Sequence, residues 1–229
     1  MAIRLITFDL DDTLWHTAPV VQAAEAVLLD WLAQHAPRLT DAAQQLRQQR
    51  QRLLAAEPAL AVRLSSLRRR MLQASLEAAG YPAETARVLG EQAFQQFLAA
   101  RQRVTLFPEV RPLLSQLAQS HVLGVLSNGN ADVGAIGIGE YFAFAFNAEM
   151  LGIGKPDPRV FQTALARLNL QPDEALHVGD HPIDDIAGAQ QAGLRAVWFN
   201  PQRQPWTGPL APDGEIQRLD QLPALLARG

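Results

Sequence analysis

The chain has 229 residues, a formal net charge of −3 and 48% apolar residues, which is enough for one folded domain with a smaller insert. It contains no cysteine, so disulfides, thiolate nucleophiles and cysteine-bound zinc are excluded. No block of lysine and arginine indicates a nucleic-acid or membrane surface, and no apolar segment is long enough for a membrane span or a signal peptide. We expect a cytoplasmic protein, a monomer or weak homo-oligomer, with neither nucleic acid nor a membrane as partner.

The predicted elements begin with a buried strand over residues 2–10, a short apolar and β-branched run. From residue 17 to about 101 the composition shifts to Ala, Gln, Leu and Arg, with apolar residues at helical spacing, which predicts about four helices. Strands and helices then alternate, which is typical of parallel βαβ units. The predicted strands cover 121–126, 142–146, 175–178 and 195–199, the predicted helices lie around 113–117, 158–168, 184–192 and 219–226, and 201–214 is a predicted loop.

This order predicts an α/β protein with a Rossmann-like parallel-sheet core and an inserted helical bundle. The core is assigned to residues 1–15 and 103–229, and the inserted α-helical domain to residues 16–102. In parallel sheets of this kind, ligands bind at the carboxyl ends of the strands. The residues that directly follow each predicted strand are therefore the candidate site.

The first strand ends in acidic residues, Asp9, Asp11 and Asp12, followed by Thr13. On an ideal strand Asp9 and Asp11 would share a face. One carboxylate could serve as nucleophile and metal ligand while the other transfers protons. A turn rich in Asp and Thr would give the same pattern without chemistry.

Two later segments carry groups that suit a phosphate. Ser127 and Asn128 follow the second strand, where a hydroxyl and a backbone amide could hold a phosphoryl oxygen, although an ordinary Asn-Gly turn explains them as well. Lys155, in Gly-Lys-Pro, is the only lysine of the chain. It could neutralise a phosphate and stabilise the developing charge.

A fourth segment supplies further carboxylates. Asp180 follows a predicted strand, and Asp184 and Asp185 open the next helix. Carboxylate oxygens suit Mg²⁺. Asp184 fits the ordinary preference for acidic residues at a helix N-terminus, and Asp185 is the better candidate for the metal site. The spacing of His177 and His181 does not indicate a metal site, so both are interpreted as supporting residues.

Taken in order, these motifs resemble those of the haloacid dehalogenase-like (HAD) hydrolase superfamily, and the helical insert resembles the type-one cap of that family. The motifs are Asp9-x-Asp11-x-Thr13, Ser127-Asn128, Lys155-Pro156 and Gly179-Asp180-x-x-x-x-Asp185. Any one of them is weak evidence, whereas four in the right order, each at a predicted strand end, are specific.

The resemblance implies a Mg²⁺-dependent phosphatase with an aspartyl-phosphate intermediate and a small phosphorylated metabolite as substrate. Asp9 would be the nucleophile and a Mg²⁺ ligand. Asp11 would be the general acid and base and would offer its main-chain carbonyl to the metal. The remaining implied roles are phosphoryl binding by Ser127, Asn128 and Lys155, metal binding by Asp180, and metal binding or orientation of its water shell by Asp185.

Within the family, the chain resembles the bacterial phosphatases that act on a ribityl-amino-uracil phosphate of riboflavin synthesis and often on FMN. The residues that carry this are Ser127 to Asn130, the segment Gly137 to Phe142, and a basic third cap helix. Trp15 and His16 at the hinge, and Arg63, Arg68 and Arg70 on that helix, could stack on a flat heterocycle or bond its carbonyl oxygens. The alternative is that Trp15 is a core residue and the arginines are solvated.

Several other functions remain open from the sequence. A haloacid dehalogenase has the same fold but needs no Mg²⁺ and lacks the second Asp of the pair, so Asp11 argues against it. A phosphatase of phosphoglycolate or a sugar phosphate shares every core motif. A receiver-like signalling domain also uses Asp, Ser or Thr, Lys and Mg²⁺, but it has its phospho-accepting Asp on a later strand and no helical insert. A binding protein with an inactive site is disfavoured because every catalytic position is filled.

Overall fold

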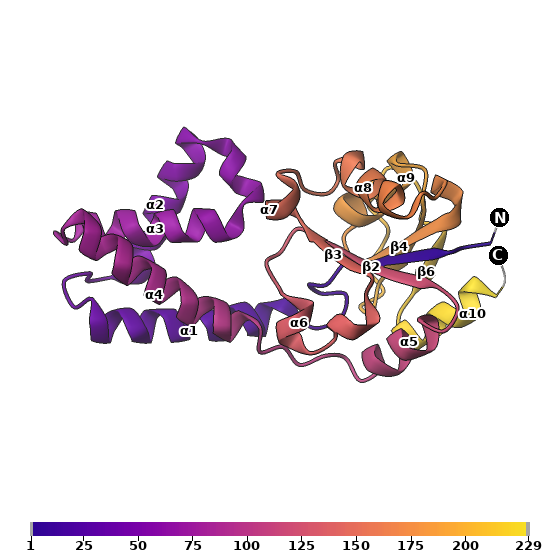
Figure 1. Cartoon of the computed structure of the whole chain (residues 1–229), viewed down its shortest axis with the longest axis horizontal. Helices are drawn as coiled ribbons and strands as arrows, with labels where there is room; N and C mark the ends of the chain where they lie inside the picture. Colours follow the sequence, from indigo (N-terminus) through magenta and orange to yellow (C-terminus); the bar gives the residue numbers. More distant parts are fainter. Residues whose placement is uncertain (1, 228–229) are drawn as a thin grey trace. The chain divides into compact units, whose positions relative to one another are not determined.

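The computed structural model describes residues 2–227 and divides the chain into two compact units (Figure 1). A core unit is built from both ends of the chain, up to His16 and from Thr105 onward. A helical unit comprises Thr17–Val104. That the core unit is catalytic and the helical unit a substrate-reading cap stays a prediction.

The described part of the core unit contains a six-stranded parallel sheet with the order β3-β2-β1-β4-β5-β6. Its strands are β1 (Leu5–Phe8), β2 (Val122–Ser127), β3 (Phe144–Asn147), β4 (Ala175–Gly179), β5 (Arg195–Phe199) and β6 (Gly214–Ile216). Every residue of β1 and β4 is buried. This is the pattern of strands covered on both faces, and it confirms the predicted α/β class.

Helices cover both faces of the sheet, with α8 and α9 on one side and α5 and α10 on the other (Figure 1). The helices of the core unit are α5 (Val110–Leu117), α6 (Val133–Ile136), α7 (Ala148–Leu151), α8 (Pro158–Leu168), α9 (Gly188–Gln191) and α10 (Leu222–Leu226). Single turns are η2 (Gly139–Tyr141), η3 (Pro172–Glu174), the π-helical turn η4 (Pro182–Ala187) and η5 (Leu219–Gln221). The apolar side of α8, which includes Phe161, packs into a core that it shares with the strands.

The register of the central strands places Asp9 at the carboxyl edge of the sheet. Phe8 pairs with Val125 of β2 and with Val178 of β4. The next residue, Asp9, leaves the sheet between these two strands, and its amide donates to the Val178 carbonyl over 2.9 Å. Residues that follow β2 and β4 therefore meet near Asp9, as expected for parallel strands.

The first strand, Leu5–Phe8, is shorter than the predicted strand over residues 2–10. The expectation that Asp9 and Asp11 share a strand face is wrong, because both lie after the strand has ended. The chain turns directly after Asp9, with Asp12 in the left-handed region at φ 59°. The amides of residues 13 and 14 donate back to the Leu10 carbonyl. Asp residues tolerate this conformation, so the acidic run that marks the site also ends the strand.

Two other boundaries differ from the prediction. The predicted loop over 201–214 ends in β6, whose three residues are too few to show a period in the sequence. The predicted helix over 184–192 begins earlier, in the π-helical turn η4, and continues as α9. Turns of this type are frequent at functional sites.

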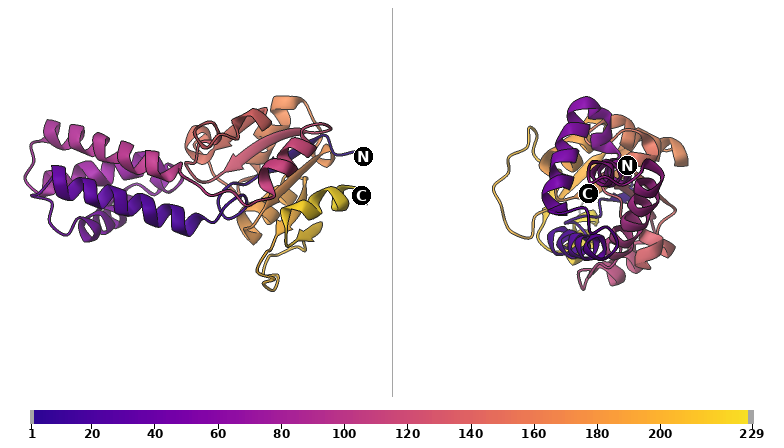
Figure 2. Two further views of the ribbon diagram at one scale, coloured as in Figure 1. Left: turned by 90° about the horizontal axis from the view of Figure 1, so that it is seen from below. Right: turned by 90° about the vertical axis from the view of Figure 1, so that its left-hand side faces the viewer.

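The helical unit confirms about four helices in the described chain. They are α1 (Thr17–His35), α2 (Ala42–Ala56), α3 (Leu64–Ala78) and α4 (Ala83–Arg101), with the short turn η1 (Pro58–Val62) between α2 and α3. Helices α1 and α4 lie side by side (Figures 1 and 2). Leu28, Leu72, Leu76 and Phe94 lie in its core, fully buried.

None of the helices in residues 2–227 combines the length and the apolarity that crossing a membrane requires.

Candidate active site

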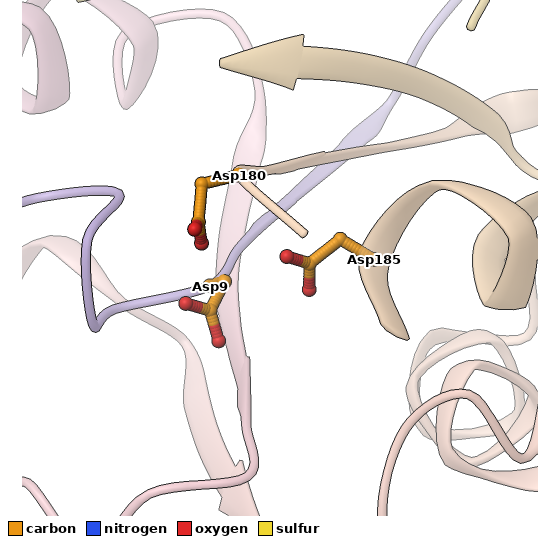
Figure 3. A group of neighbouring side chains, drawn as sticks. All are labelled: Asp9, Asp180 and Asp185. Atoms are coloured by element: carbon orange, nitrogen blue, oxygen red, sulfur yellow. The ribbon is translucent and has the colours of Figure 1, made fainter. Parts of the chain in front are cut away.

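Three carboxylates from different parts of the chain converge at the carboxyl edge of the sheet (Figure 3). Asp9 follows β1, Asp180 follows β4, and Asp185 belongs to η4. Each offers an oxygen, and these oxygens lie within 4.8 Å of one another. The sequence placed Asp9 and Asp180 after strands and Asp185 at the start of the next helix, and the fold brings them together.

Lys155 joins two of these carboxylates. Its Nζ donates to Asp9 Oδ1 over 2.6 Å and to Asp185 Oδ1 over 2.5 Å. The Lys155 side chain is only 2% exposed. A buried ammonium needs such partners because desolvation would otherwise cost several kcal/mol. Lys155 therefore sits where it can meet the oxygens of a phosphate bound at Asp9.

Asn128 fixes the backbone of Lys155. Its side-chain nitrogen donates to the Lys155 carbonyl over 2.9 Å, and its side-chain oxygen accepts from the Lys155 amide over 2.8 Å. The same nitrogen also approaches Asp184 at 3.3 Å. These bonds give Asn128 a positioning role, while its predicted contact with substrate stays a prediction. Ser127 is buried at the end of β2, and its Oγ accepts from the Gly129 amide over 3.0 Å.

Asp185 is held on both of its oxygens. Besides Lys155, its Oδ1 lies 3.1 Å from His177 Nε2, and its Oδ2 accepts from the His181 amide over 2.9 Å. His177 is itself fully buried, with Nδ1 2.8 Å from the Thr7 hydroxyl. So many bonds leave Asp185 few free lone pairs. They favour a role in orienting the water shell of a metal over direct ligation, and they agree with the interpretation of His177 as a supporting residue.

Gly179 makes room for the Asp185 carboxylate. A Cβ at this position would lie 2.2 Å from Asp185 Cγ, far inside van der Waals contact. We expect Gly179→Ala to push Asp185 away from Lys155 and to weaken Mg²⁺ binding by about 10- to 100-fold, the usual effect of disturbing residues that support a metal site. Isothermal titration calorimetry measures the Kd, and circular dichroism checks that the variant is folded. A folded variant with the wild-type Kd would contradict this account.

Trp15 holds Asp11 and is not available to stack on a substrate. Its side chain is fully buried, and its Nε1 donates to Asp11 Oδ1 over 3.1 Å. The hypothesis that Trp15 offers a stacking face is therefore wrong, because a ring inside the core has no free face. Asp11 is half-buried, and its carboxylate is not in the group formed by Asp9, Asp180 and Asp185. This fits a proton-transfer role better than metal ligation through the side chain.

The local electrostatics differ sharply among these groups. Burial raises the pKa of Asp180 to about 7, and the carboxylates of Asp185 and Asp12 add to the shift. Burial also raises the pKa of Asp9 well above its usual value, despite the opposing effect of Lys155. Burial alone would raise the pKa of Asp185 as well, but Lys155 and His177 together hold it below its usual value.

The donor set fits a hard divalent cation. Three carboxylates lie around a single ammonium, so the ionised cluster carries excess negative charge. Burial is the main cause of the raised pKa values of Asp9 and Asp180, and repulsion from neighbouring carboxylates adds to it. Carboxylate oxygens are the ligands that Mg²⁺ prefers. The carboxylate oxygens of Asp9 and Asp180 make fewer hydrogen bonds than those of Asp185, so these two residues are the better candidates to hold it. The predicted contribution of the Asp11 carbonyl stays a prediction.

Two of the predicted substrate contacts, Arg68 and Arg70, already have partners within the helical unit. The Arg68 guanidinium pairs with Glu25 over 2.7 Å and lies 3.6 Å from the centroid of the Phe97 ring. Arg70 pairs with Glu57 over 2.5 Å. Arg63 was expected on the third helix, but it lies one residue before the start of α3. Their contact with substrate stays a prediction.

Sequence reasoning did not find every residue that shapes the site. Thr13 is fully buried, and its hydroxyl lies 3.3 Å from Asp180 Oδ1 and 3.5 Å from Asp9 Oδ2. Trp198 on β5 donates from Nε1 to the Asp180 carbonyl over 2.8 Å. Thr13 belongs to the first motif of the sequence, but no role was predicted for it. Trp198 had no local signal, because its strand reads as ordinary buried sheet.

Comparison with known proteins identifies the family. The sequence matches the haloacid dehalogenase-like hydrolase family over residues 3–193. It is 33% identical to the 5-amino-6-(5-phospho-D-ribitylamino)uracil phosphatase YigB of Escherichia coli K12, over 98% of this chain and 96% of that protein.

Solved structures give a second view of the similarity. A structure described as a 2-haloacid dehalogenase from Pseudomonas syringae pv. Tomato DC3000 is 54% identical, with a TM-score of 0.97 over 99% of each chain. The putative HAD-hydrolase YfnB from Bacillus subtilis, described as bound to magnesium, is 25% identical, with a TM-score of 0.68 over 99% of each chain. The family match, the sheet order and the acidic cluster agree, and this chain belongs to the haloacid dehalogenase-like hydrolase family.

Proposed function

We propose that this hydrolase is a Mg²⁺-dependent phosphatase that carries the phosphoryl group on Asp9. The observation that supports this most directly is the buried contact of Lys155 with Asp9, beside Asp180 and Asp185. A phosphate monoester is an anion, and a carboxylate can attack it only where positive charge offsets the repulsion. Lys155 supplies one such charge, and the acidic cluster is suited to bind a second.

In this mechanism an Asp9 oxygen attacks phosphorus, and the bond from phosphorus to the ester oxygen breaks. Asp11 donates a proton to the leaving alkoxide and then accepts one from the water that attacks the phosphoryl group. Hydrolysis releases phosphate and regenerates the Asp9 carboxylate. Ser127 and Lys155 bind the phosphoryl oxygens. Mg²⁺ bound at Asp9 and Asp180 would supply charge neutralisation for those oxygens.

The alternative favoured by the 54% identical structure is a haloacid dehalogenase. A haloacid dehalogenase of this fold lacks the second Asp of the Asp-x-Asp pair and needs no metal. The presence of Asp11 therefore argues against that function. The test is to incubate the purified protein with para-nitrophenyl phosphate and Mg²⁺, and separately with 2-chloropropionate. We expect phosphate release without chloride release. Chloride release in the absence of any phosphatase activity would overturn the proposal.

The role of Asp11 predicts a dependence on the leaving group. Asp11→Asn should lower kcat by roughly 10²–10⁴-fold, the usual range for removing a general acid and base. The loss should be smaller for para-nitrophenyl phosphate than for an alkyl phosphate, because nitrophenolate needs no proton to leave. Steady-state kinetics on both substrates measure this. An equal loss on both would contradict the acid role.

For the substrate, we propose a phosphorylated ribityl compound, either the ribityl-amino-uracil phosphate of riboflavin synthesis or FMN. The support is the 33% identity to YigB, which is named as a 5-amino-6-(5-phospho-D-ribitylamino)uracil phosphatase. The expected result is a higher kcat/KM for these two compounds than for phosphoglycolate or glucose phosphates. A tenfold preference for phosphoglycolate or a hexose phosphate would refute the substrate assignment and leave the phosphatase proposal intact.

Arg68 and Arg70 can be separated by stability and kinetics. Arg68→Ala should lower the free energy of unfolding by about 1–2 kcal/mol, because the partly buried guanidinium lies on Phe97 and pairs with Glu25. Arg70→Ala should cost less than about 1 kcal/mol, since its exposed ion pair with Glu57 contributes little. Urea unfolding measures both. If either arginine also binds a heterocycle, its removal raises the KM for FMN more than that for para-nitrophenyl phosphate.

A further inference from the structure

A line of buried polar side chains runs from the centre of the sheet to the acidic cluster. Thr7 on β1 and His177 on β4 are register partners on neighbouring central strands, which Figure 2 shows enclosed by the helices of the core unit. The Thr7 hydroxyl lies 2.8 Å from His177 Nδ1, and on the other side of the ring Nε2 lies 3.1 Å from Asp185 Oδ1. Thr7 and His177 are fully buried. A buried polar group that loses its partner stays unpaired, so each contact constrains the next.

The chemistry of the groups fixes the direction of these hydrogen bonds. Asp185 pairs with the Lys155 ammonium, so its carboxylate is ionised and can only accept. His177 Nε2 must therefore carry the proton in this contact. In the neutral ring Nδ1 then has a lone pair, to which the Thr7 hydroxyl can donate. The other acceptor for that hydroxyl is the Leu176 carbonyl, which at 3.4 Å makes a weaker contact.

The position of Asp185 in turn determines where the ammonium lies. Its Oδ1 accepts from both His177 and Lys155, and its Oδ2 accepts from the His181 amide. A carboxylate held at both oxygens cannot rotate without losing one of these bonds. Contacts with Asp185 and Asp9 occupy two of the three donors of Lys155, and the third can turn to a phosphoryl oxygen. A shift of Asp185 would therefore move the ammonium relative to Asp9.

We propose that Thr7 and His177 are positioning residues for the reaction: the Thr7 hydroxyl orients the His177 ring, and the ring fixes Asp185 and through it the Lys155 ammonium. The inference rests on the proposed phosphatase function and adds to it a residue, Thr7, that lies inside a strand and outside every motif of the sequence. Phe161 packs edge-on against the His177 ring, with 5.1 Å between ring centroids, and restrains it from the α8 side.

The test removes the Thr7 hydroxyl and follows the ammonium. Lys155 is the only lysine of the chain, so ¹⁵N-labelled lysine gives a single Nζ signal in an NMR spectrum. Thr7→Val keeps the size of the side chain and should shift this signal, because His177 Nδ1 loses its donor. It should also lower kcat for para-nitrophenyl phosphate by about tenfold, the scale seen when a residue that supports a metal site is changed.

Two matched variants separate the hydrogen bond from packing. Thr7→Ser keeps the hydroxyl and should retain the wild-type Nζ signal and most of the activity. Thr163→Val removes a hydroxyl that donates to the Arg159 carbonyl on α8, and it should change neither readout. A Thr7→Val variant with the wild-type signal and kcat would overturn the proposal. Equal losses in Thr7→Ser and Thr7→Val would also overturn it, since they would make Thr7 a packing residue.

A measurement on the wild type needs no folded variant of Thr7. In ¹⁵N-histidine-labelled protein, the His177 signals are those that disappear in His177→Gln, and they should show a proton on Nε2. A ring without a proton on Nε2 would overturn the proposal, because it could not donate to Asp185. A wild type that releases phosphate from no ester, para-nitrophenyl phosphate included, would instead refute the phosphatase function. The two NMR measurements would still decide whether Thr7 and His177 position Lys155.

Discussion

Asp9→Asn is expected to abolish phosphatase activity, with a loss of at least about 10⁴-fold in kcat, the scale seen when a nucleophile is removed from a cooperating set of groups. An amide oxygen is a poor nucleophile and a poor ligand for Mg²⁺, so both proposed functions of Asp9 disappear together. Phosphate release from para-nitrophenyl phosphate at saturating Mg²⁺ measures the loss. Residual activity within tenfold of the wild type would refute Asp9 as the nucleophile.

The control for this variant is its stability. Asp9 is buried near two other carboxylates, so replacing its charge removes repulsion as well as the bond to Lys155. Lys155 keeps its contact with Asp185. We therefore expect a melting temperature close to that of the wild type in the absence of metal, which would show that the lost activity reflects chemistry and not unfolding. A large fall in melting temperature would instead show that Asp9 is needed for the stability of the fold, and the loss of activity could then be explained by unfolding.

Removal of divalent cations with EDTA is expected to abolish activity, and added Mg²⁺ to restore it. Asp9, Asp180 and Asp185 outnumber the single Lys155, and an anionic substrate adds further negative charge. Ca²⁺ should not restore activity, because it takes more ligands in a looser geometry than in-line transfer tolerates. Full activity in excess EDTA would favour the dehalogenase alternative.

A stability measurement tests the same site without turnover. A ligand that binds only the folded chain stabilises it, by about 2.7 kcal/mol at a concentration of 100 times its Kd. Mg²⁺ should therefore raise the melting temperature of the wild type. Asp180→Asn should reduce this increase, because it removes a proposed ligand. An increase of the same size in both proteins would place the cation elsewhere.

The sequence was informative wherever the chemistry lies in short motifs at strand ends. Asp9 and Asp180 were recognised because parallel strands deliver the residues that follow them to one edge of the sheet, and Lys155 because it is the only lysine of the chain, in a Gly-Lys-Pro segment. The β5 strand and α8 were predicted with their observed bounds, since their apolar patterns are clear and Pro158 marks a helix start. The family assignment needed only the order of these motifs, and the family match over residues 3–193 confirms it.

The tertiary structure decided how these residues are supported. That His177 contacts Asp185, that Gly179 must lack a side chain beside it, and that Trp15 is buried against Asp11 all depend on packing between segments. No local pattern encodes such distances, because a side chain's neighbours are set by how strands and turns pack. The observed strand β1 is shorter than the predicted strand over residues 2–10 because the turn that follows it is fixed by its own backbone hydrogen bonds.

The sequence by itself determined the alternating α/β order, the inserted helices and the set of groups available for chemistry, since period, composition and residue type are local properties. Only the tertiary structure decided that Lys155 links Asp9 to Asp185, that Arg68 lies on Phe97 within the helical unit, and that Trp198 donates to the Asp180 carbonyl. The physical reason is that charge pairing and burial act over a few ångströms, and residues this close in space are separated along this chain by as many as 176 positions, as Asp9 and Asp185 are (185 − 9 = 176).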